Sequence, residues 1–150
     1  MAKRSLLGAT AAAALVAGLA WATPGSGSST TVFVRSTLHE RVKIQTHPRE
    51  SNDVFTQRIT IVPGGFSGWH SHPGPALVGV LSGEVAIYEA GSKDCTPRIV
   101  KAGEAFTEEA GHAHNVLSVG TEDYVAYATF VLPTGAPNRT DEAKPEACAF

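Results

Sequence analysis

Short runs of alternating apolar and polar residues fill the chain after residue 30, and turn residues separate these runs at regular intervals. The clearest run is 54–62 (VFTQRITIV), which ends at the turn sequence Pro63-Gly64-Gly65. Alternation of this kind places successive side chains on opposite faces of a β-strand. After the N-terminal residues, apolar residues do not recur with a helical period over the length of a helix. The pattern therefore predicts an all-β domain.

About nine or ten short strands are expected, and the runs that predict them are 31–38, 41–46, 54–62, 76–81, 85–89, 98–101, 104–107, 113–118 and 124–132. Ser82-Gly83-Glu84 is a tight-turn signal between two of these runs, so 76–81 and 85–89 are predicted to pair as a hairpin. So many short strands with regular turns are typical of a β-sandwich or barrel. The tail from Pro133 is rich in proline and is expected to follow the surface.

The first 22 residues resemble a secretory signal peptide. Lys3 and Arg4 precede an apolar run rich in Ala and Leu, and Ala20-Trp21-Ala22 offers small residues around a cleavage site. A retained membrane anchor is the alternative, but the run falls short of the ~20 apolar residues of a membrane span. We expect cleavage after Ala22, secretion, a flexible linker at 23–30 and a folded domain at 31–150.

Removal of the signal peptide changes the charge balance. The whole chain has 12 Lys and Arg against 14 Asp and Glu, a net charge of −2. Without Lys3 and Arg4, 10 basic residues remain against 14 acidic ones, a net charge of −4. No run of basic residues remains, so neither nucleic acid nor an anionic membrane surface is an expected partner.

Two cysteines, Cys95 and Cys148, lie in loop-like or terminal sequence. In an exported chain, an oxidising compartment favours a disulfide between them. Free thiols or soft metal ligands are the alternatives, and neither cysteine is close in sequence to a histidine pair. We predict a disulfide that fixes the C-terminal tail to the loop around residue 95.

Two pairs of histidines carry the candidate chemistry: His70 and His72, and then His112 and His114. In an extended segment, side chains two residues apart point to the same side. Each pair can therefore direct two imidazoles into one space, as metal ligands require. The pairs indicate a metal site more clearly than they indicate its reaction.

The spacing around these histidines resembles the motifs of the cupin superfamily. Gly64, His70, His72, residue 76 and Gly83 follow the spacing of the first cupin motif, and Gly103, Gly111 and His114 are similar to the second. The resemblance, with its flanking strands, extends over about 54–132. It implies a double-stranded β-helix, or jelly-roll barrel, in which His70, His72 and His114 bind a divalent metal. Three neutral imidazoles suit Fe, Mn, Zn, Ni or Cu and leave coordination positions open.

The chain departs from the cupin pattern at several positions. Most metal-binding cupins have a glutamate where this chain has Ala76, which cannot coordinate a metal. His112 is a candidate fourth ligand, but a residue directly after a turn glycine often leaves the strand frame, so a position outside the ligand set is favoured, either exposed or next to the ligands. Glu108 and Glu109 are weaker substitutes. If Ala76 faces inward, alternation predicts an apolar pocket lining: Val78, Val80, Phe66, Trp69, Phe106, Tyr127 and Phe130.

The resemblance leaves the function open between three classes. One is a metal-dependent enzyme, similar to a dioxygenase or an isomerase, that acts on a small organic molecule. The second is a module that binds a metal or a small ligand without turnover. The third is a structural barrel with a relic site, in which replacing His70 and His72 would change neither metal content nor stability. A homodimer is expected only because cupins often pair through edge strands.

Overall fold

The computed structural model describes residues 27–44, 46 and 51–148. The predicted signal peptide and the first residues of the predicted linker lie outside these residues. The compact unit that holds the sheets begins at Val32. None of the described residues belongs to a helix with the length and apolar character that a membrane span requires.

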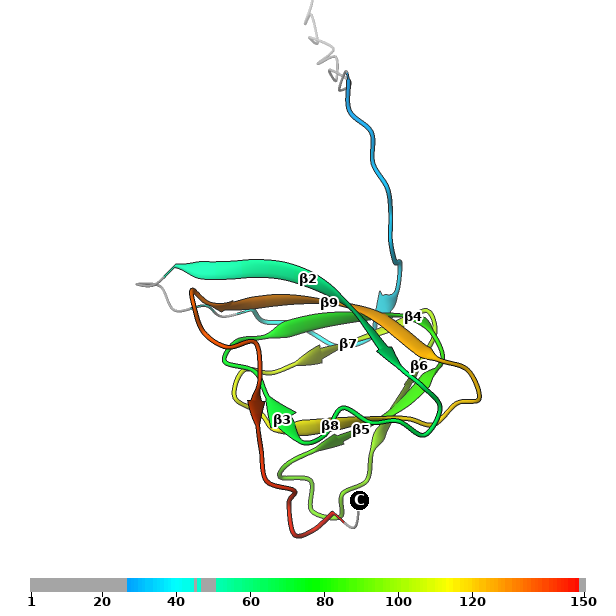
Figure 1. Ribbon diagram of the computed structural model, residues 1–150, viewed down its shortest axis with the longest axis vertical. Helices are drawn as coiled ribbons and strands as arrows, with labels where there is room; N and C mark the ends of the chain where they lie inside the picture. The colour runs from blue at the N-terminus through cyan, green and yellow to red at the C-terminus, as the bar shows by residue number, and fades with distance from the viewer. Residues whose placement is uncertain (1–26, 45, 47–50, 149–150) are drawn as a thin grey trace, which may run out of the picture. The chain divides into compact units, whose positions relative to one another are not determined.

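Two five-stranded sheets form the two layers of the fold (Figure 1). The first sheet has the order β1 (Thr37–Leu38), β7 (Glu104–Glu108), β4 (Ala76–Ser82), β9 (Tyr124–Pro133) and β2 (Asn52–Ile61). The second has the order β10 (Thr140–Asp141), β3 (His70–Ser71), β8 (His114–Ser118), β5 (Glu84–Glu89) and β6 (Arg98–Lys101). Neighbouring strands are antiparallel except β1 and β7. The predicted all-β jelly-roll fold is confirmed.

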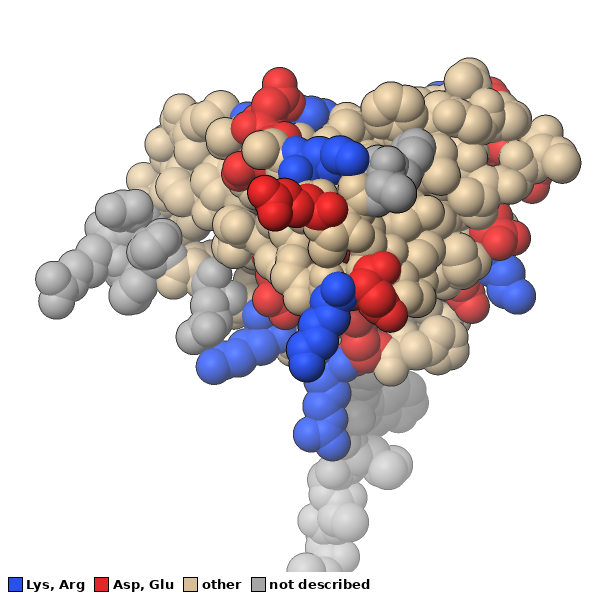
Figure 2. Space-filling model, turned by 90° about the horizontal axis from the view of Figure 1, so that it is seen from below, with Lys and Arg blue, Asp and Glu red and all other residues tan. Residues whose placement is uncertain are grey.

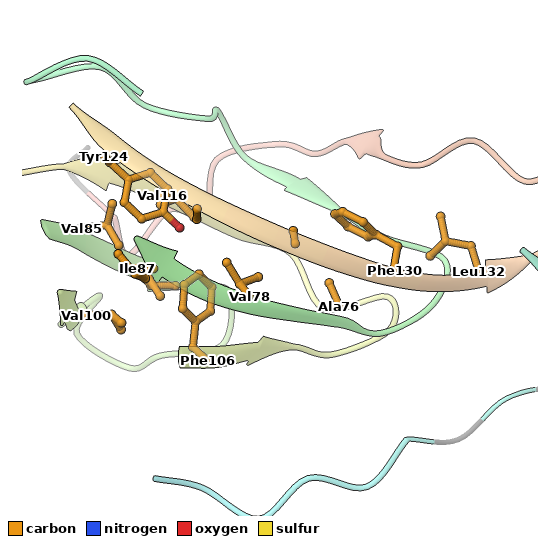
Figure 3. Close-up of a cluster of buried hydrophobic side chains, with 13 residues drawn as sticks. Ala76, Val78, Val85, Ile87, Val100, Phe106, Val116, Tyr124, Phe130 and Leu132 are labelled. Carbon is orange, nitrogen blue, oxygen red and sulfur yellow. The ribbon is translucent and has the colours of Figure 1, made fainter. Parts of the chain in front are cut away.

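Alternating residues of both sheets form the core between the layers (Figure 3). On β4 the predicted inward residues Ala76, Val78 and Val80 are all buried. They share one core with β5 and β8 residues of the opposite sheet, including Ile87 and Val116. Each fully buried aliphatic or aromatic side chain contributes roughly 1.5–3 kcal/mol. This core fixes the distance between the sheets and therefore the space available for a site.

The predicted hairpin of 76–81 and 85–89 is wrong, because β4 and β5 lie in different sheets. Gly83 lies between them with φ of 76°, a conformation that residues with a Cβ rarely adopt. A Cβ at this position would lie 2.7 Å from the Cα of Tyr124. The turn therefore carries the chain from one sheet to the other, and its tight packing against β9 requires glycine.

The first part of the domain has less regular structure than predicted. The predicted strand 31–38 is reduced to β1, and the described residues of 41–46 form no strand. Apolar side chains in this part of the chain are poorly buried, since Phe33 and Val42 are exposed. Alternation alone does not make a strand without a neighbouring backbone to pair with. β10 was not predicted.

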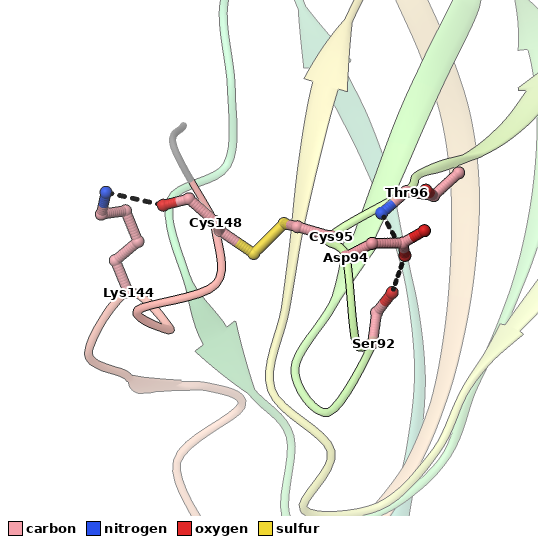
Figure 4. Close-up of a disulfide and its surroundings, with 6 residues drawn as sticks. All are labelled: Ser92, Asp94, Cys95, Thr96, Lys144 and Cys148. Atoms are coloured by element: carbon pink, nitrogen blue, oxygen red, sulfur yellow. Dashed lines mark hydrogen bonds between the residues drawn. A yellow bond between two sulfur atoms is a disulfide. The ribbon is translucent and has the colours of Figure 1, made fainter.

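The residues after β9, 134–148, form a segment that we call the C-terminal strap. β10 lies within the strap and pairs with β3, with Thr140 opposite Ser71. The Ser71 hydroxyl donates a hydrogen bond to Glu142 at 2.7 Å. At its end, Cys148 forms the predicted disulfide with Cys95, with Cα atoms 5.2 Å apart (Figure 4). The strap is thus fixed at one edge of the second sheet.

Candidate metal centre

Strand pairing brings the three predicted metal ligands together. β3 and β8 pair with His70 directly opposite His114, and His72 follows the end of β3. All three imidazoles are buried, and the atoms they offer as ligands lie within 4.8 Å of one another. The cluster therefore joins residues that are more than forty positions apart in the sequence.

Backbone carbonyls fix the tautomer of each imidazole. Nδ1 of His70 lies 2.8 Å from the carbonyl oxygen of Gly68, and Nδ1 of His114 lies 3.0 Å from that of His112. Nδ1 of His72 contacts the carbonyl oxygen of Asn138 in the C-terminal strap. A carbonyl oxygen only accepts, so each Nδ1 must donate. In the neutral rings, all three Nε2 atoms then present lone pairs, which is the arrangement that metal ligation requires.

Glu108 adds a carboxylate to the cluster from the opposite sheet. It lies at the end of β7 and is 9% exposed. Its Oε2 lies 3.3 Å from Nε2 of His72, and its Oε1 lies 3.3 Å from Nε2 of His114. In the pairing of β4 with β7, Glu108 is directly opposite Ala76. The carboxylate that is missing at position 76 is therefore supplied by the adjacent strand.

The electrostatics of the cluster follow from burial and close charges. Burial lowers the pKa of His70 to about 4, so this imidazole is neutral at neutral pH. Burial alone would raise the pKa of Glu108, but His114 and His72 outweigh it and lower the pKa to about 2. Burial opposes the charged form of His114, yet Glu108 raises its pKa. The carboxylate is thus ionised, and its charge favours a proton or another cation at the adjacent imidazoles.

The donor set fits a cation. A carboxylate and two Nε2 lone pairs are all acceptors, and acceptors that converge in a buried site need a proton or a metal ion between them. Nε2 of His114 is buried and lies 3.3 Å from Oε1 of Glu108, but it forms no hydrogen bond with correct geometry to any described residue. Adjacent ligands on one metal, each about 2.0–2.2 Å from it, lie roughly 3.0–3.5 Å apart. The 3.3 Å separations match that range.

His112, the candidate fourth ligand, is not brought into this cluster. It lies in the turn before β8, outside the strand frame, and its Nε2 is 2.8 Å from the carbonyl oxygen of Ala90. Its own carbonyl instead supports His114. Glu108 was predicted to be only a weak substitute for the missing glutamate ligand, although the sequence pattern indicated that it faces inward. Alternation along 104–108 puts Glu108 on the same face as the core residue Phe106.

A cavity of about 140 Å³ lies beside the cluster. Pockets for drug-sized ligands usually measure ~300–1,000 Å³, so this cavity suits a much smaller molecule. Part of its lining was predicted, since Val78 and Phe130 contribute. The prediction for Tyr127 is wrong, because this residue alternates to the outer face of β9 and stacks against Phe33. Its inward neighbour Tyr124 lines the cavity instead.

On the face in Figure 2, acidic side chains are interspersed with the basic ones. Among the residues described there, no extended basic surface faces the viewer, as phosphate backbones would require.

The fold and the cluster together define an all-β barrel with a buried metal-binding site. A protein-family model described as "Cupin domain" matches residues 57–130. This range includes the three histidines of the cluster and Glu108. The chain belongs to the cupin superfamily, as its sequence motifs predicted. Its three-histidine cluster supports a divalent metal as cofactor, and the donor atoms do not select one metal.

Several solved structures are similar to this chain. An oxalate oxidase in complex with the substrate analogue glycolate is 28% identical with a TM-score of 0.50, over 58% of this chain and 45% of that chain. The oxalate decarboxylase of Bacillus subtilis, which has Mn(II) centres, is 22% identical with a TM-score of 0.50, over 59% of this chain and 23% of that one. This chain thus spans less than half of either protein. No curated protein matches it.

Proposed function

We propose that the protein is a secreted, metal-dependent cupin enzyme that acts on a small organic molecule. In this proposal His70, His72, His114 and Glu108 bind one divalent metal. The observation that carries the proposal is the convergence of three lone pairs and one carboxylate in a buried site beside a small cavity. The likeness to an oxalate oxidase with bound glycolate supports an enzyme for a small substrate.

Four protein ligands leave the metal with open coordination positions. A divalent ion with three neutral imidazoles and one carboxylate keeps a net charge of +1. When bound, the metal would supply either redox chemistry with O₂, as in a dioxygenase or oxidase, or Lewis-acid chemistry, as in an isomerase. The three imidazoles and Glu108 would hold it, while the apolar side chains of the cavity would exclude bulk water. The oxalate oxidase favours the redox alternative.

A non-catalytic binding module is the second candidate. Glu108 is the only carboxylate among the described residues that line the cavity, and it already contacts two histidines. The cavity therefore offers no separate carboxylate as a general base. A protein that holds metal and ligand without turnover would have this composition.

Metal content is the first test. We expect close to one metal ion per chain, by elemental analysis of untagged mature protein, and loss of the metal in His70→Ala and His114→Ala. His39→Ala is the matched control, because His39 is exposed and lies outside the cluster. A native protein without metal, even after reconstitution with Mn, Fe, Co, Ni or Zn, would overturn the proposal.

Turnover then separates the two candidates. The metal-loaded protein would be assayed for oxygen uptake and for isomerisation with a panel of small organic molecules. Turnover that disappears in His70→Ala supports the enzyme. Thermal stabilisation by a panel member, with stoichiometric metal and no reaction, supports the binding module instead.

A further inference from the structure

Arg139 of the C-terminal strap lies at the same cavity as the metal cluster. It lines the cavity of about 140 Å³ together with His70, His72 and Glu108. Its positive charge also disfavours protonation of His70, a smaller effect on that pKa than burial. Strap and cluster are therefore parts of one site, although Arg139 is 25 residues beyond the last histidine of the cluster.

Hydrogen bonds hold the guanidinium of Arg139 in place, but they do not engage all of its N–H groups. Nε and NH2 donate to Oδ1 of Asp141, and NH1 donates to the carbonyl oxygen of Ser67 at 3.2 Å. These bonds use three of the five N–H groups, which leaves two. The Arg139 side chain is 39% exposed, while that of Asp141 is 84% exposed. Solvent therefore screens the attraction between these two side chains, and the ion pair is weak.

Arg139 is also the only basic side chain among the described cavity residues outside the histidine cluster. The rest of the lining, apart from the cluster, is neutral and includes the apolar Val78 and Phe130. In such surroundings, a guanidinium fork binds a planar carboxylate by two parallel, charge-assisted hydrogen bonds. With the +1 of the proposed metal centre, the cavity carries a second positive charge.

We infer that Arg139 is the substrate-recognition residue of this site and selects small molecules with a carboxylate group. The inference rests on the proposed function and adds the chemical class of the substrate to it. One part of the molecule binds at the metal while its carboxylate contacts Arg139 near the strap. The cavity volume limits the substrate to a few non-hydrogen atoms.

The strap gives Arg139 a defined position. The pairing of β10 with β3 puts Asp141 opposite His70, two residues after Arg139. The carbonyl oxygen of Asn138, the residue before Arg139, contacts His72. The backbone that carries the arginine is thus tied to the metal ligands from both sides.

Binding of glycolate and of its neutral amide, glycolamide, tests the inference. Both would be titrated calorimetrically into metal-loaded native protein, Arg139→Gln and Arg139→Lys, with metal content measured for each. Arg58→Gln is the matched control, because Arg58 lies on an exposed position of β2. We expect Arg139→Gln to weaken glycolate binding about tenfold or more and to leave glycolamide within twofold. Arg139→Lys should fall between, and Arg58→Gln should change neither.

The outcomes separate this inference from the proposed function. Equal losses for glycolate and glycolamide, or no loss in either Arg139 variant, would overturn the role of Arg139 while the metal site stands. Inorganic phosphate that binds as tightly as glycolate, with the same dependence on Arg139, would overturn the carboxylate class. If Arg139→Gln does not fold, Arg139→Lys decides by the same comparison. A native protein without metal overturns the proposed function and this inference together.

Discussion

The three histidines of the cluster differ in how their orientation is maintained. His70 and His114 each donate to a carbonyl two residues earlier in the chain, so their support is local. His72 donates to Asn138, which is 66 residues away. Outer hydrogen bonds of this kind typically change metal affinity by about 10- to 100-fold when they are lost. Two ligands are therefore fixed by residues just before their own strands, and the third depends on the strap.

Glu108→Gln should weaken metal binding by about 10-fold or more. The amide keeps the shape of the side chain but removes the negative charge that balances the cation. Metal affinity would be measured by competition with a chelator. Glu109→Gln is the control, because Glu109 follows β7, is exposed and lies outside the histidine cluster. Equal affinity in Glu108→Gln and native protein would contradict a ligand role for Glu108.

Moving the carboxylate back to β4 gives a sharper version of this test. Ala76 and Glu108 are opposite each other on adjacent strands and both are buried. We expect Glu108→Ala to lose metal affinity and the double variant Ala76→Glu/Glu108→Ala to recover part of it. Ala76→Glu alone should destabilise the protein, because it adds a second carboxylate to a packed space. No recovery in a folded double variant would show that the two positions are not equivalent.

At the scale of elements, the side chain of Glu40 extends the short pairing of β1 with β7. β1 pairs with β7 only at Glu104 and Ala105. Beyond that, Glu40 accepts hydrogen bonds from the backbone N–H and the hydroxyl of Thr107, and from Arg98 at 3.2 Å. Burial acts in the opposite direction, but these partners lower the pKa of Glu40.

Glu40→Gln should therefore lower the free energy of unfolding, and the effect should depend on pH. The carboxylate is largely in contact with solvent, which screens the charges, so we expect only about 0.5 kcal/mol at pH 7. A lowered pKa in the folded state stabilises the fold above the ordinary pKa of 4.5, and this contribution is lost as the pH falls through the lowered pKa. Urea denaturation at pH 7 and near pH 3 would measure it. A difference that grows on acidification would contradict this account.

The strap connects the disulfide to the metal centre. Replacing both cysteines, Cys95→Ser and Cys148→Ser, should lower the free energy of unfolding by up to about 4 kcal/mol in the chain-entropy model. It should also lower metal affinity by up to about tenfold, because the carbonyl that orients His72 lies on the strap. Chelator competition on folded protein, with and without a reductant, would test this coupling. If stability falls and metal affinity does not, the strap holds the fold alone.

Most of the strands were predictable, because alternation reports burial on one face. This holds for β4 and β9, whose inward residues form the core, and for β2, whose half-buried inward residues pack against it. The pairing of Ala76 with Glu108 was not predictable, since the register of two strands about thirty residues apart leaves no local pattern. The contact of Asn138 with His72 could not be predicted either, because the irregular residues of the strap have no periodicity. The histidine motif thus located the site, but the tertiary contacts complete it.

For the whole molecule, the signal-peptide prediction has a direct test. The exported protein should begin at Thr23, which intact-mass measurement and N-terminal sequencing would show. It should also carry no free thiol, because Cys95 and Cys148 are joined. A mature protein that keeps residues 1–22 would support the membrane-anchor alternative instead. Light scattering of the same sample would decide whether the protein is a homodimer.

The position of Glu108 has a consequence for how metal sites are recognised from sequence. A search keyed to a glutamate at the place of Ala76 would classify this chain as having lost its site. A search in three dimensions, which asks for three converging imidazoles and an acidic group near two of them, would retain it. When one residue of a metal-binding motif is replaced, the residue opposite it on the neighbouring strand should therefore be checked. That residue decides whether the metal site is lost or has its carboxylate on the neighbouring strand instead.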